Sequence, residues 1–306
     1  MDAKTRRLAA KLAPRLFKKQ GFSGRHYIDF RLYFLGEVLR ADIASRFGVA
    51  PAGATRDLAV YRQAAPKNIV FDGSSKTYRM GPSFHPLFDH PLDRTLTALS
   101  HGFGDGLGGS GGSMVPCNFP EPINRPATDT LATVTRAIRA GAVLSVVYVS
   151  PSGIESEREI VPFALADHGP RWHTRAFDRK SGSYRDFVLT RMRRATPVQG
   201  IAPGPSEGAA NDIQWNRVVE LELVPHPDGP RPEISALDYP MEDGVLMLRA
   251  RAALARYVLR RWSVDCSPDH SLSGPEYRLW LRNPLALCGV ESAALAPGYV
   301  PPDDRG

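Results

Sequence analysis

The side chains best suited to bind a charged ligand lie in two β-rich segments of the chain. RWHTRAFD (171–178) and YRDFVLTRM (184–192) flank a Gly-containing turn at residues 179–182, which predicts a hairpin. Successive side chains of a strand point to opposite faces, so each segment places its basic residues on one face. We expect the two faces to coincide in one patch, lined by Ser150, His173, Arg175, Arg185 and Arg191.

This expected patch has the chemistry of an anion or nucleotide receptor. A guanidinium group forms paired hydrogen bonds with phosphate and also stacks on bases. The alternative is the solvent-exposed charged face of a small sheet, and the pattern alone does not decide between the two. His173 by itself is more typical of a hydrogen-bonded structural histidine than of a catalytic one. No catalytic residue, metal site or cofactor is expected.

Charge is distributed unevenly along the 306 residues and indicates a second kind of site. Residues 1–80 carry 16 Lys and Arg against 6 Asp and Glu, whereas residues 81–306 carry 23 against 26. A basic first domain on a nearly neutral remainder is typical of nucleic-acid binding. A solvated basic surface and a membrane-surface patch are the alternatives, so the local pattern has to discriminate.

The local pattern in this first domain predicts three helices. Aromatic residues recur at helical spacing from Tyr27 to Phe34, and Gly36 follows as a stop. A short helix is expected over residues 40–47, and a third begins near Pro51, a residue favoured in the first helical turn. This order is the layout of a helix-turn-helix.

On the third helix, Ala54, Leu58 and Tyr61 form the expected apolar stripe, which leaves small and basic residues outward. Residues 68–72 and 76–80 flank Gly-Ser-Ser and predict a two-stranded wing. Small residues let a helix enter the major groove, arginine reaches guanine edges, and wing cations pair with phosphates. The expected DNA contacts are Arg25, Arg40, Thr55, Arg56, Arg62, Lys67, Lys76 and Arg79. A trihelical protein-interaction module is the alternative.

The pattern predicts an α+β protein of several domains. A winged helix-turn-helix with a basic N-terminal helix is expected over 1–90, and a linker with a Gly/Ser/Pro-rich segment over 91–130. A mostly antiparallel β-module follows over 131–200, and an α+β extension over 201–306. In the extension, residues 244–262 are expected to pass from a short strand into a helix with Ala250, Leu254, Tyr257 and Val258 inward. Arg249, Arg256 and Arg260 are expected to be solvated or salt-bridged.

The remaining composition points to the cytoplasm. Cys117, Cys266 and Cys288 are few and scattered, so neither a disulfide framework nor a zinc site is expected, which is typical of a reducing compartment. The basic N-terminus lacks the continuous apolar segment of a signal peptide. No apolar run approaches the ~18 residues of a membrane span, so no membrane partner is expected.

Residues 171–192 resemble the WYL domain of bacterial transcriptional regulators, in the form W-[YH]-x-R-A-[YF]-D followed by [FY]-R-x-F-x-L-x-R, with His173 at the middle letter of the family name. YIDFRLYFLGEVLRADIASRFGV and the segment after it are similar to the winged helix of WYL repressors associated with phage-defence islands (BREX- and CBASS-linked). The two matches occur in the family's order and cover most of residues 20–200.

The resemblance implies a small Sm/SH3-like barrel for the WYL domain and a C-terminal extension that contributes to dimerisation. It also implies a homodimeric repressor of defence genes, whose WYL pocket senses a nucleotide or nucleic acid. We therefore expect a duplex operator in the form of an inverted repeat. The alternatives are a nucleotide-processing enzyme with His173 as acid or base, and a sensor of single-stranded nucleic acid.

Overall fold

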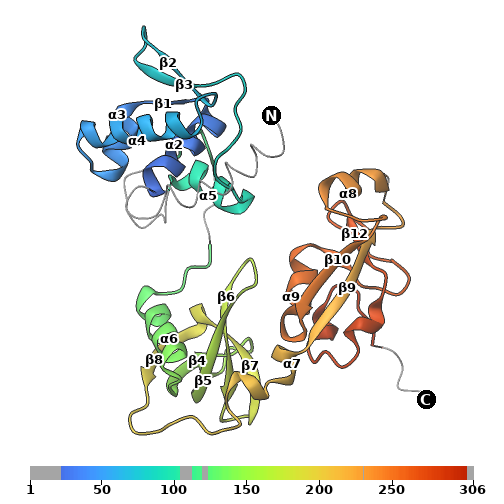
Figure 1. Ribbon diagram of the computed structural model, residues 1–306. Helices are drawn as coiled ribbons and strands as arrows, with labels where there is room; N and C mark the ends of the chain where they lie inside the picture. The colour runs from blue at the N-terminus through green and yellow to red at the C-terminus, as the bar shows by residue number, and fades with distance from the viewer. Residues whose placement is uncertain (1–21, 104–111, 119–122, 230, 302–306) are drawn as a thin grey trace. The chain divides into compact units, whose positions relative to one another are not determined.

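The computed structural model describes residues 22–103, 112–118, 123–229 and 231–301. The chain divides into two compact units, Met1–Pro120 and Glu121–Gly306, and each is considered by itself (Figure 1). The basic N-terminal helix expected in the first twenty residues and the Gly-rich residues 104–111 lie outside the described residues.

The first unit contains a helical core with a small sheet. Its elements are α2 (Phe22–Leu35), β1 (Glu37–Val38), α3 (Arg40–Phe47), α4 (Pro51–Ala64), β2 (Ile69–Asp72), β3 (Thr77–Met80) and α5 (Leu92–His101). The strands form an antiparallel sheet in the order β1-β3-β2, and the β2–β3 hairpin projects from the helices (Figure 1). This arrangement is the expected winged helix-turn-helix. Helix α5 falls within the interval 91–130 that the sequence assigns to a linker.

Local signals explain why α2, α3 and α4 end and begin where they do. Gly36 and Gly48 follow the first two helices with φ of 76° and 59°, a left-handed conformation that glycine adopts without steric cost. Pro51 opens α4 at its first position. Ala54, Leu58 and Tyr61 are the buried residues of α4, as the apolar stripe predicts. The helix-turn-helix prediction is therefore confirmed in its bounds and in its buried face.

The second unit begins with a domain built on one antiparallel sheet. Its elements are α6 (Thr128–Ala140), β4 (Leu144–Val149), β5 (Glu155–Asp167), β6 (Trp172–Asp178), β7 (Ser183–Val188), η1 (Leu189–Arg191) and β8 (Met192–Pro197). The strand order is β7-β6-β5-β4-β8, and α6 packs its buried Val134 and Ala137 on the sheet's core. Strands β7 and β8 remain the two edges, so in the described residues the expected Sm/SH3-like barrel is not closed by hydrogen bonds.

A second α+β domain completes this unit. Its elements are η2 (Ala209–Asn211), α7 (Ile213–Asn216), β9 (Val218–Pro225), α8 (Pro232–Asp238), β10 (Leu246–Arg251), α9 (Ala252–Arg261), β11 (Val264–Asp265), β12 (Leu279–Leu281), η3 (Pro284–Leu287) and η4 (Ala293–Leu295). The sheet order is β10-β9-β12-β11. The change from a short strand to a helix predicted within residues 244–262 is confirmed, with β10 ending at Arg251 and α9 beginning at Ala252.

The buried face of α9 differs from the expected one. Ala252, Ala255 and Leu259 pack into the domain core, whereas Tyr257 is only partly buried and contacts the preceding domain. The helix starts at residue 252, so Ala250, expected on its inner face, belongs to β10 instead. Arg249 pairs with Glu220 at 3.3 Å, and Arg256 with Asp186 at 3.6 Å, as the salt-bridged alternative predicts.

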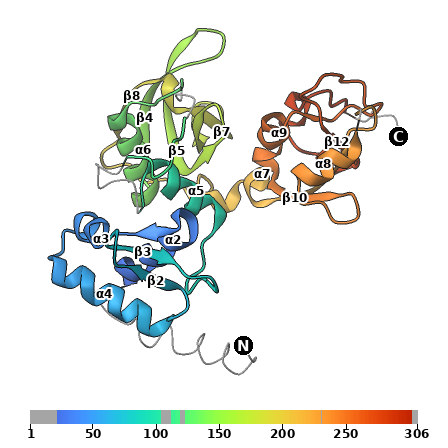
Figure 2. The same cartoon turned by 90° about the horizontal axis from the view of Figure 1, so that it is seen from above.

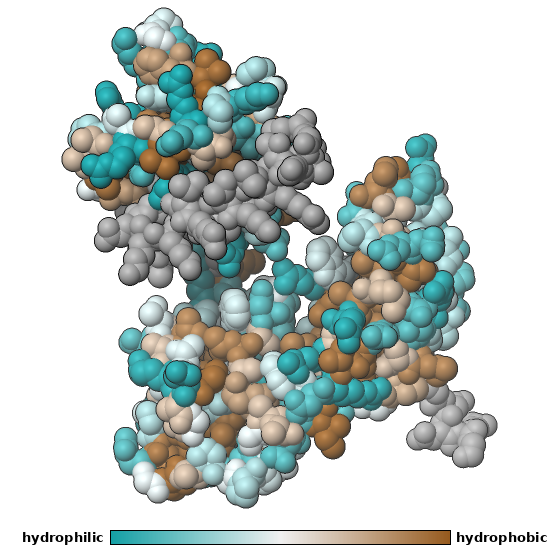
Figure 3. Space-filling model, in the orientation of Figure 1, coloured by the Kyte–Doolittle hydropathy of each residue, from teal (hydrophilic) through white to brown (hydrophobic). Residues whose placement is uncertain are grey.

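Within the described residues, each helix is too short or too polar to cross a bilayer. On the visible face of each unit, polar side chains are interspersed with apolar ones (Figure 3).

Candidate nucleic-acid interface and effector site

The outward face of α4 presents the residue types that the sequence assigns to DNA reading. Thr55, Arg56, Ala59, Arg62 and Gln63 are all exposed, while the opposite side of the helix is buried. Figure 2 shows α4 running along one side of the first unit. The hydroxyl of Thr55 donates to the carbonyl of Pro51 at 2.9 Å, so it lies close to the helix and adds little bulk. The outer face of α4 therefore has the small residue Thr55 near its start, and it carries the exposed side chains of Arg56 and Arg62.

A groove of about 430 Å³ separates this face from the wing. It is lined on the helix side by Thr55, Ala59, Arg62 and Gln63 and on the wing side by Tyr78. Tyr78 is half-buried because Val38 of β1 lies opposite it in the sheet. The sequence analysis did not select Tyr78, since its position inside a wing strand gave no signal that it would face the helix.

The predicted wing contacts occupy different places on the hairpin. Lys76 lies at the turn, is exposed, and has a φ of 57°. Arg79 is exposed on β3 and pairs with Asp72 at 3.3 Å, so part of its charge is compensated. The hydroxyls of Ser74 and Ser75 donate to the same carboxylate and hold the pKa of Asp72 well below its usual range. Lys76 therefore lies at the hairpin turn with no ion-pair partner among the residues that the structure describes.

Three further predicted DNA contacts differ in accessibility. Arg40 is exposed at the first position of α3, and Lys67 is exposed between α4 and β2. Arg25 requires a correction, because its exposed fraction is 8%. It lies inside the first unit near Asp57. Burial raises the pKa of Asp57 overall, and the positive charges of Arg25 and Arg56 partly oppose this rise. A side chain this deeply buried does not reach a DNA backbone, so Arg25 is excluded from the proposed phosphate contacts.

The predicted single patch on the central sheet is wrong in one essential respect. Strand β7 pairs with β6 in a register that places Arg185 opposite Ala176 and Asp186 opposite Arg175. Arg185 therefore lies on the face of Ala176, which points into the core, and not on the face of His173 and Arg175. Alternation predicts the faces within each strand correctly, but the register between strands decides which faces coincide.

Arg191 also departs from the expected alternation. The strand ends at Val188, and Arg191 closes the short 3-10 helix η1. The register of β8 with β4 pairs Met192 with Tyr148, so η1 ends where β8 begins to pair with β4. The Ser150 hydroxyl accepts a hydrogen bond from the backbone nitrogen of Ile154 at 3.2 Å within this turn. Arg191 therefore lies outside the strand face that carries His173 and Arg175, as Arg185 does.

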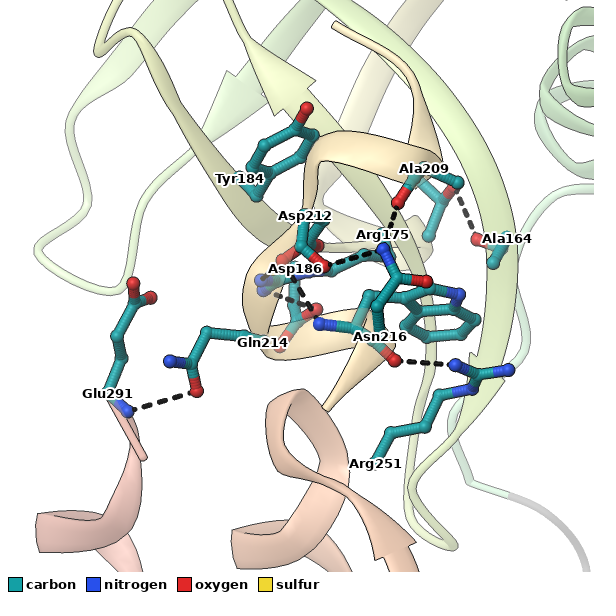
Figure 4. A network of polar contacts seen from close by, with 12 residues as sticks. Ala164, Arg175, Tyr184, Asp186, Ala209, Asp212, Gln214, Asn216, Arg251 and Glu291 are labelled. Atoms are coloured by element: carbon teal, nitrogen blue, oxygen red, sulfur yellow. Dashed lines mark hydrogen bonds and ion pairs between the residues drawn. The ribbon is translucent and has the colours of Figure 1, made fainter. Parts of the chain in front are cut away.

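Arg175 is buried and bound by two carboxylates. Its Nε lies 2.8 Å from Oδ2 of Asp212 and its Nη2 lies 3.2 Å from Oδ1, while Nη1 lies 3.3 Å from Oδ1 of Asp186 (Figure 4). Its exposed fraction is 5% and that of Asp212 is 0%. Burial opposes the charged form, but the hydrogen bonds with Asp212 and the charge of Asp186 raise the pKa of Arg175 overall. Arg175 is thus a structural cation here.

His173 lies on the same face and is buried between the two domains of the second unit. It stacks on His168 with ring centroids 3.7 Å apart, and Tyr257 of α9 lies against both rings. Burial lowers the pKa of His168 to about 3 and also lowers the pKa of His173. Both ring nitrogens of His168 are buried without a hydrogen-bond partner within the described residues. His173 is therefore a neutral packing residue at this junction.

Three protein-family models match successive parts of the chain. Residues 25–100 match the BrxR transcriptional regulator winged helix-turn-helix domain, and 129–197 match the WYL domain. Residues 218–287 match the C-terminal dimerization domain of the BrxR transcriptional regulator.

Full-length relatives extend the match across most of the chain. The DNA-binding transcriptional repressor CapW of Escherichia coli (strain KTE188) is 34% identical over 271 residues, covering 84% of this chain and 87% of its own. CapW of Pseudomonas aeruginosa is 31% identical over 270 residues with the same coverage. CapW of Stenotrophomonas maltophilia is 31% identical over 257 residues, covering 78% and 82%. This chain belongs to the CapW family.

In this member of the CapW family, the WYL match contains His173, Arg175 and Arg191, but the partner of Arg175 lies outside it. Asp212 falls between residue 197, where the WYL match ends, and residue 218, where the dimerization match begins. The sequence analysis missed Asp212, His168 and Tyr257. No local signal marks Asp212, because it is 37 positions from Arg175 and its α7 is only four residues long.

Proposed function

We propose that the protein is a homodimeric, sequence-specific DNA-binding transcriptional repressor that acts in the cytoplasm. The observation that carries the proposal is the exposed outer face of α4, with Thr55, Arg56 and Arg62 beside the groove that Tyr78 closes. A helix with a small residue near its start and two long arginine side chains on its outer face fits the major groove of duplex DNA. The printed names of the CapW relatives and of the matched winged helix domain support the same function.

Dimerisation and an operator with two-fold symmetry follow from the same proposal. Residues 218–287 match a dimerization domain, and a two-fold dimer presents two α4 helices to two half-sites. Arg40, Lys67, Lys76 and Arg79 are then phosphate contacts, since each is exposed on the first unit. Defence genes of the kind implied by the family resemblance are the proposed targets.

The WYL domain is the proposed effector domain, and a nucleotide or nucleic acid is the proposed ligand. Arg175, Ser150 and Arg191 remain the candidate contacts, whereas Arg185 does not because it lies on the other face. A nucleotide-processing enzyme is disfavoured by the surroundings of His173. Its 5% exposed fraction and its stacking on His168 leave no path for proton transfer to a substrate.

Binding assays with duplex and single-stranded DNA test this function directly. The probe is the intergenic duplex upstream of the protein's own gene, compared by fluorescence anisotropy with each of its separated strands and with a scrambled duplex. We expect the native duplex to bind at least about 1,000-fold more tightly than the scrambled duplex, the lower end of the range for specific regulators. Equal affinity for single strands and duplex would support the single-strand sensor instead.

A further inference from the structure

The buried guanidinium of Arg175 already holds an anion that belongs to the chain itself. Asp212 contacts it through both carboxylate oxygens, at 2.8 and 3.2 Å, which is the paired geometry that arginine also offers to phosphate. Asp186 occupies the remaining side at 3.3 Å. Because Arg175 is 5% exposed and Asp212 is fully buried, no donor edge of Arg175 is open to an external oxyanion while Asp212 is in place.

Asp212 also holds the short helix that leads from the WYL domain into the dimerization domain. Its side chain accepts a hydrogen bond from the backbone nitrogen of Trp215 at 3.1 Å and thereby caps α7. The ring of Trp215 meets Phe163 of β5 with centroids 5.6 Å apart. Asp212 and Trp215 are thus the attachments of α7 to the WYL sheet that the described contacts provide.

On its other side α7 is attached to the dimerization domain. The side-chain nitrogen of Gln214 donates to the carbonyl of Gly289 at 2.9 Å. Its side-chain oxygen accepts from the backbone nitrogen of Glu291 at 3.3 Å, as Figure 4 shows. Arg251 of β10 donates to the carbonyl of Trp215 at 2.5 Å. A change in the position of Asp212 is therefore passed to the dimerization domain through α7.

The charges around Arg175 balance only when Asp212 is present. Asp186 is shared, because it also lies 3.6 Å from Arg256 and accepts a hydrogen bond from the Tyr257 hydroxyl at 2.9 Å. Without Asp212, the buried guanidinium of Arg175 and the partly buried guanidinium of Arg256 face a single carboxylate. An uncompensated buried cation is strongly destabilising, so the pocket would attract a replacement anion.

We infer that Asp212 is an internal competitor for the effector, and that an oxyanion of the phosphate class binds Arg175 by displacing its carboxylate. The inference rests on the proposed effector control of the WYL domain and names its regulation. A ligand with the charge density of a phosphate monoester or pyrophosphate replaces a singly charged carboxylate, and α7 then loses its ion pair with β6. The winged helix takes no part in the exchange itself.

Asp212→Asn tests the competition, with inorganic pyrophosphate as the probe and calorimetry on the full chain as the readout. Asparagine is nearly isosteric and is itself a good helix cap, so α7 is kept while the competing charge is removed. We expect the variant to bind pyrophosphate about tenfold or more tightly than the parent, the scale of one charge-assisted hydrogen bond. Adding Arg175→Gln should abolish that gain.

Glu207→Gln is the matched control within the same connecting segment. Glu207 also binds a WYL arginine through both oxygens, with Nε and Nη2 of Arg179 each at 2.8 Å. In Glu207→Gln, Arg179 retains its ion pair with Glu159 and is more exposed than Arg175. We therefore expect the pyrophosphate affinity of this variant to stay within about twofold of that of the parent. An equal gain in Glu207→Gln, or no gain in Asp212→Asn, would overturn the inference.

Hydrogen–deuterium exchange over residues 209–217 supplies a second readout. Exchange should accelerate in Asp212→Asn without ligand and in the parent with saturating pyrophosphate, since both lose the tie to Arg175. Unchanged exchange in the saturated parent would contradict displacement. If Asp212→Asn fails to fold, Asp212→Ser keeps a capping oxygen and takes its place. Duplex binding is measured separately, so failure of DNA binding contradicts the proposed function while leaving this exchange test interpretable.

Discussion

The Tyr61 hydroxyl donates a hydrogen bond of 2.5 Å to the carboxylate of Asp29, and both side chains have an exposed fraction of 0%. The contact joins α4, the proposed DNA-recognition helix, to α2. The same carboxylate also accepts from the backbone nitrogen of Leu87 at 3.1 Å and lies 2.9 Å from His90 Nε2. Burial, the negative charge of Asp29 and its hydrogen bond raise the pKa of the Tyr61 hydroxyl, so it stays a donor. One buried carboxylate therefore sets the position of the proposed recognition helix.

Asp29→Asn should destabilise the winged helix, because an amide cannot satisfy the same set of donors with a charged acceptor. We expect a loss of about 2–3 kcal/mol in the free energy of unfolding of the first unit. Chemical denaturation followed by circular dichroism measures it. Asp89→Asn, at an exposed position of the same segment, is the control and should change stability by less than about 0.5 kcal/mol. Equal effects of the two variants would remove Asp29 from its organising role.

Arg56 and Lys76 should affect DNA binding in different ways. Arg56 lies on the outer face of α4, so Arg56→Ala should cost about 1–3 kcal/mol on the native operator and relax the preference at one base position. Lys76 lies at the wing turn, so Lys76→Gln should weaken binding to all duplexes about equally. Anisotropy titrations with the operator and its single-base variants separate the two. If Arg56→Ala weakened binding to all duplexes equally and Lys76→Gln relaxed the preference at one base position, the roles proposed for the two residues would be reversed.

Phosphate contacts should appear in the salt dependence of duplex affinity. The slope of log K against log salt is about −0.9 per phosphate neutralised, so Lys67→Gln should make it less negative by about 1. Lys180→Gln, which removes an exposed cation from the central sheet domain, serves as the control and should leave the slope unchanged. A slope that does not respond to Lys67 would place that residue outside the interface.

The stability of the second unit should fall as the pH drops below 6.5. The folded-state pKa of His168 is about 3, below its ordinary value of 6.5, because the ring is buried beside His173 and Arg256. The unfolded chain therefore binds more protons between these values, and the stabilisation by the neutral ring is complete above pH 6.5 and lost as the pH falls. We expect a loss approaching about 1 kcal/mol per pH unit in this window.

His168→Phe isolates that contribution, because phenylalanine keeps the stacked ring and cannot be protonated. Thermal unfolding of the second unit at pH 7.5, 6.5 and 5.5 should show a shallower dependence in this variant than in the parent. His85→Gln, at an exposed position of the other unit, should behave as the parent does. An unchanged slope in His168→Phe would mean that the ring titrates normally.

The sequence predicts the elements of the winged helix well, because its signals are local. Gly36 and Gly48 mark the ends of α2 and α3, and Pro51 marks the start of α4. The spacing of Leu58 and Tyr61 identifies the buried face of α4. The hub at Asp29 is not predictable in this way. Its partners lie 32 and 58 positions further along the chain, and an acidic residue within a helix gives no sign that it will be buried.

The surroundings of the proposed effector contacts were predicted only in part, for a related reason. Alternation assigns Arg175 and Arg185 to faces of their own strands, but the register that pairs Arg185 with Ala176 depends on the turn and the core together. The partners that neutralise Arg175 come from the other edge of the hairpin and from the connecting segment, as Asp186 and Asp212. Such charge pairing is a property of tertiary packing, which no periodicity in the sequence encodes.

Footprinting of the native protein on the intergenic duplex upstream of its own gene tests the central claim most directly. A two-fold dimer that inserts one α4 helix per half-site should protect an inverted repeat. Its half-site centres should lie about 10 base pairs, or a multiple of that, apart. Protection should disappear in a variant that combines Arg56→Ala with Arg62→Ala. Protection of one isolated, non-palindromic site, or protection that survives in that variant, would contradict DNA recognition by the outer face of α4.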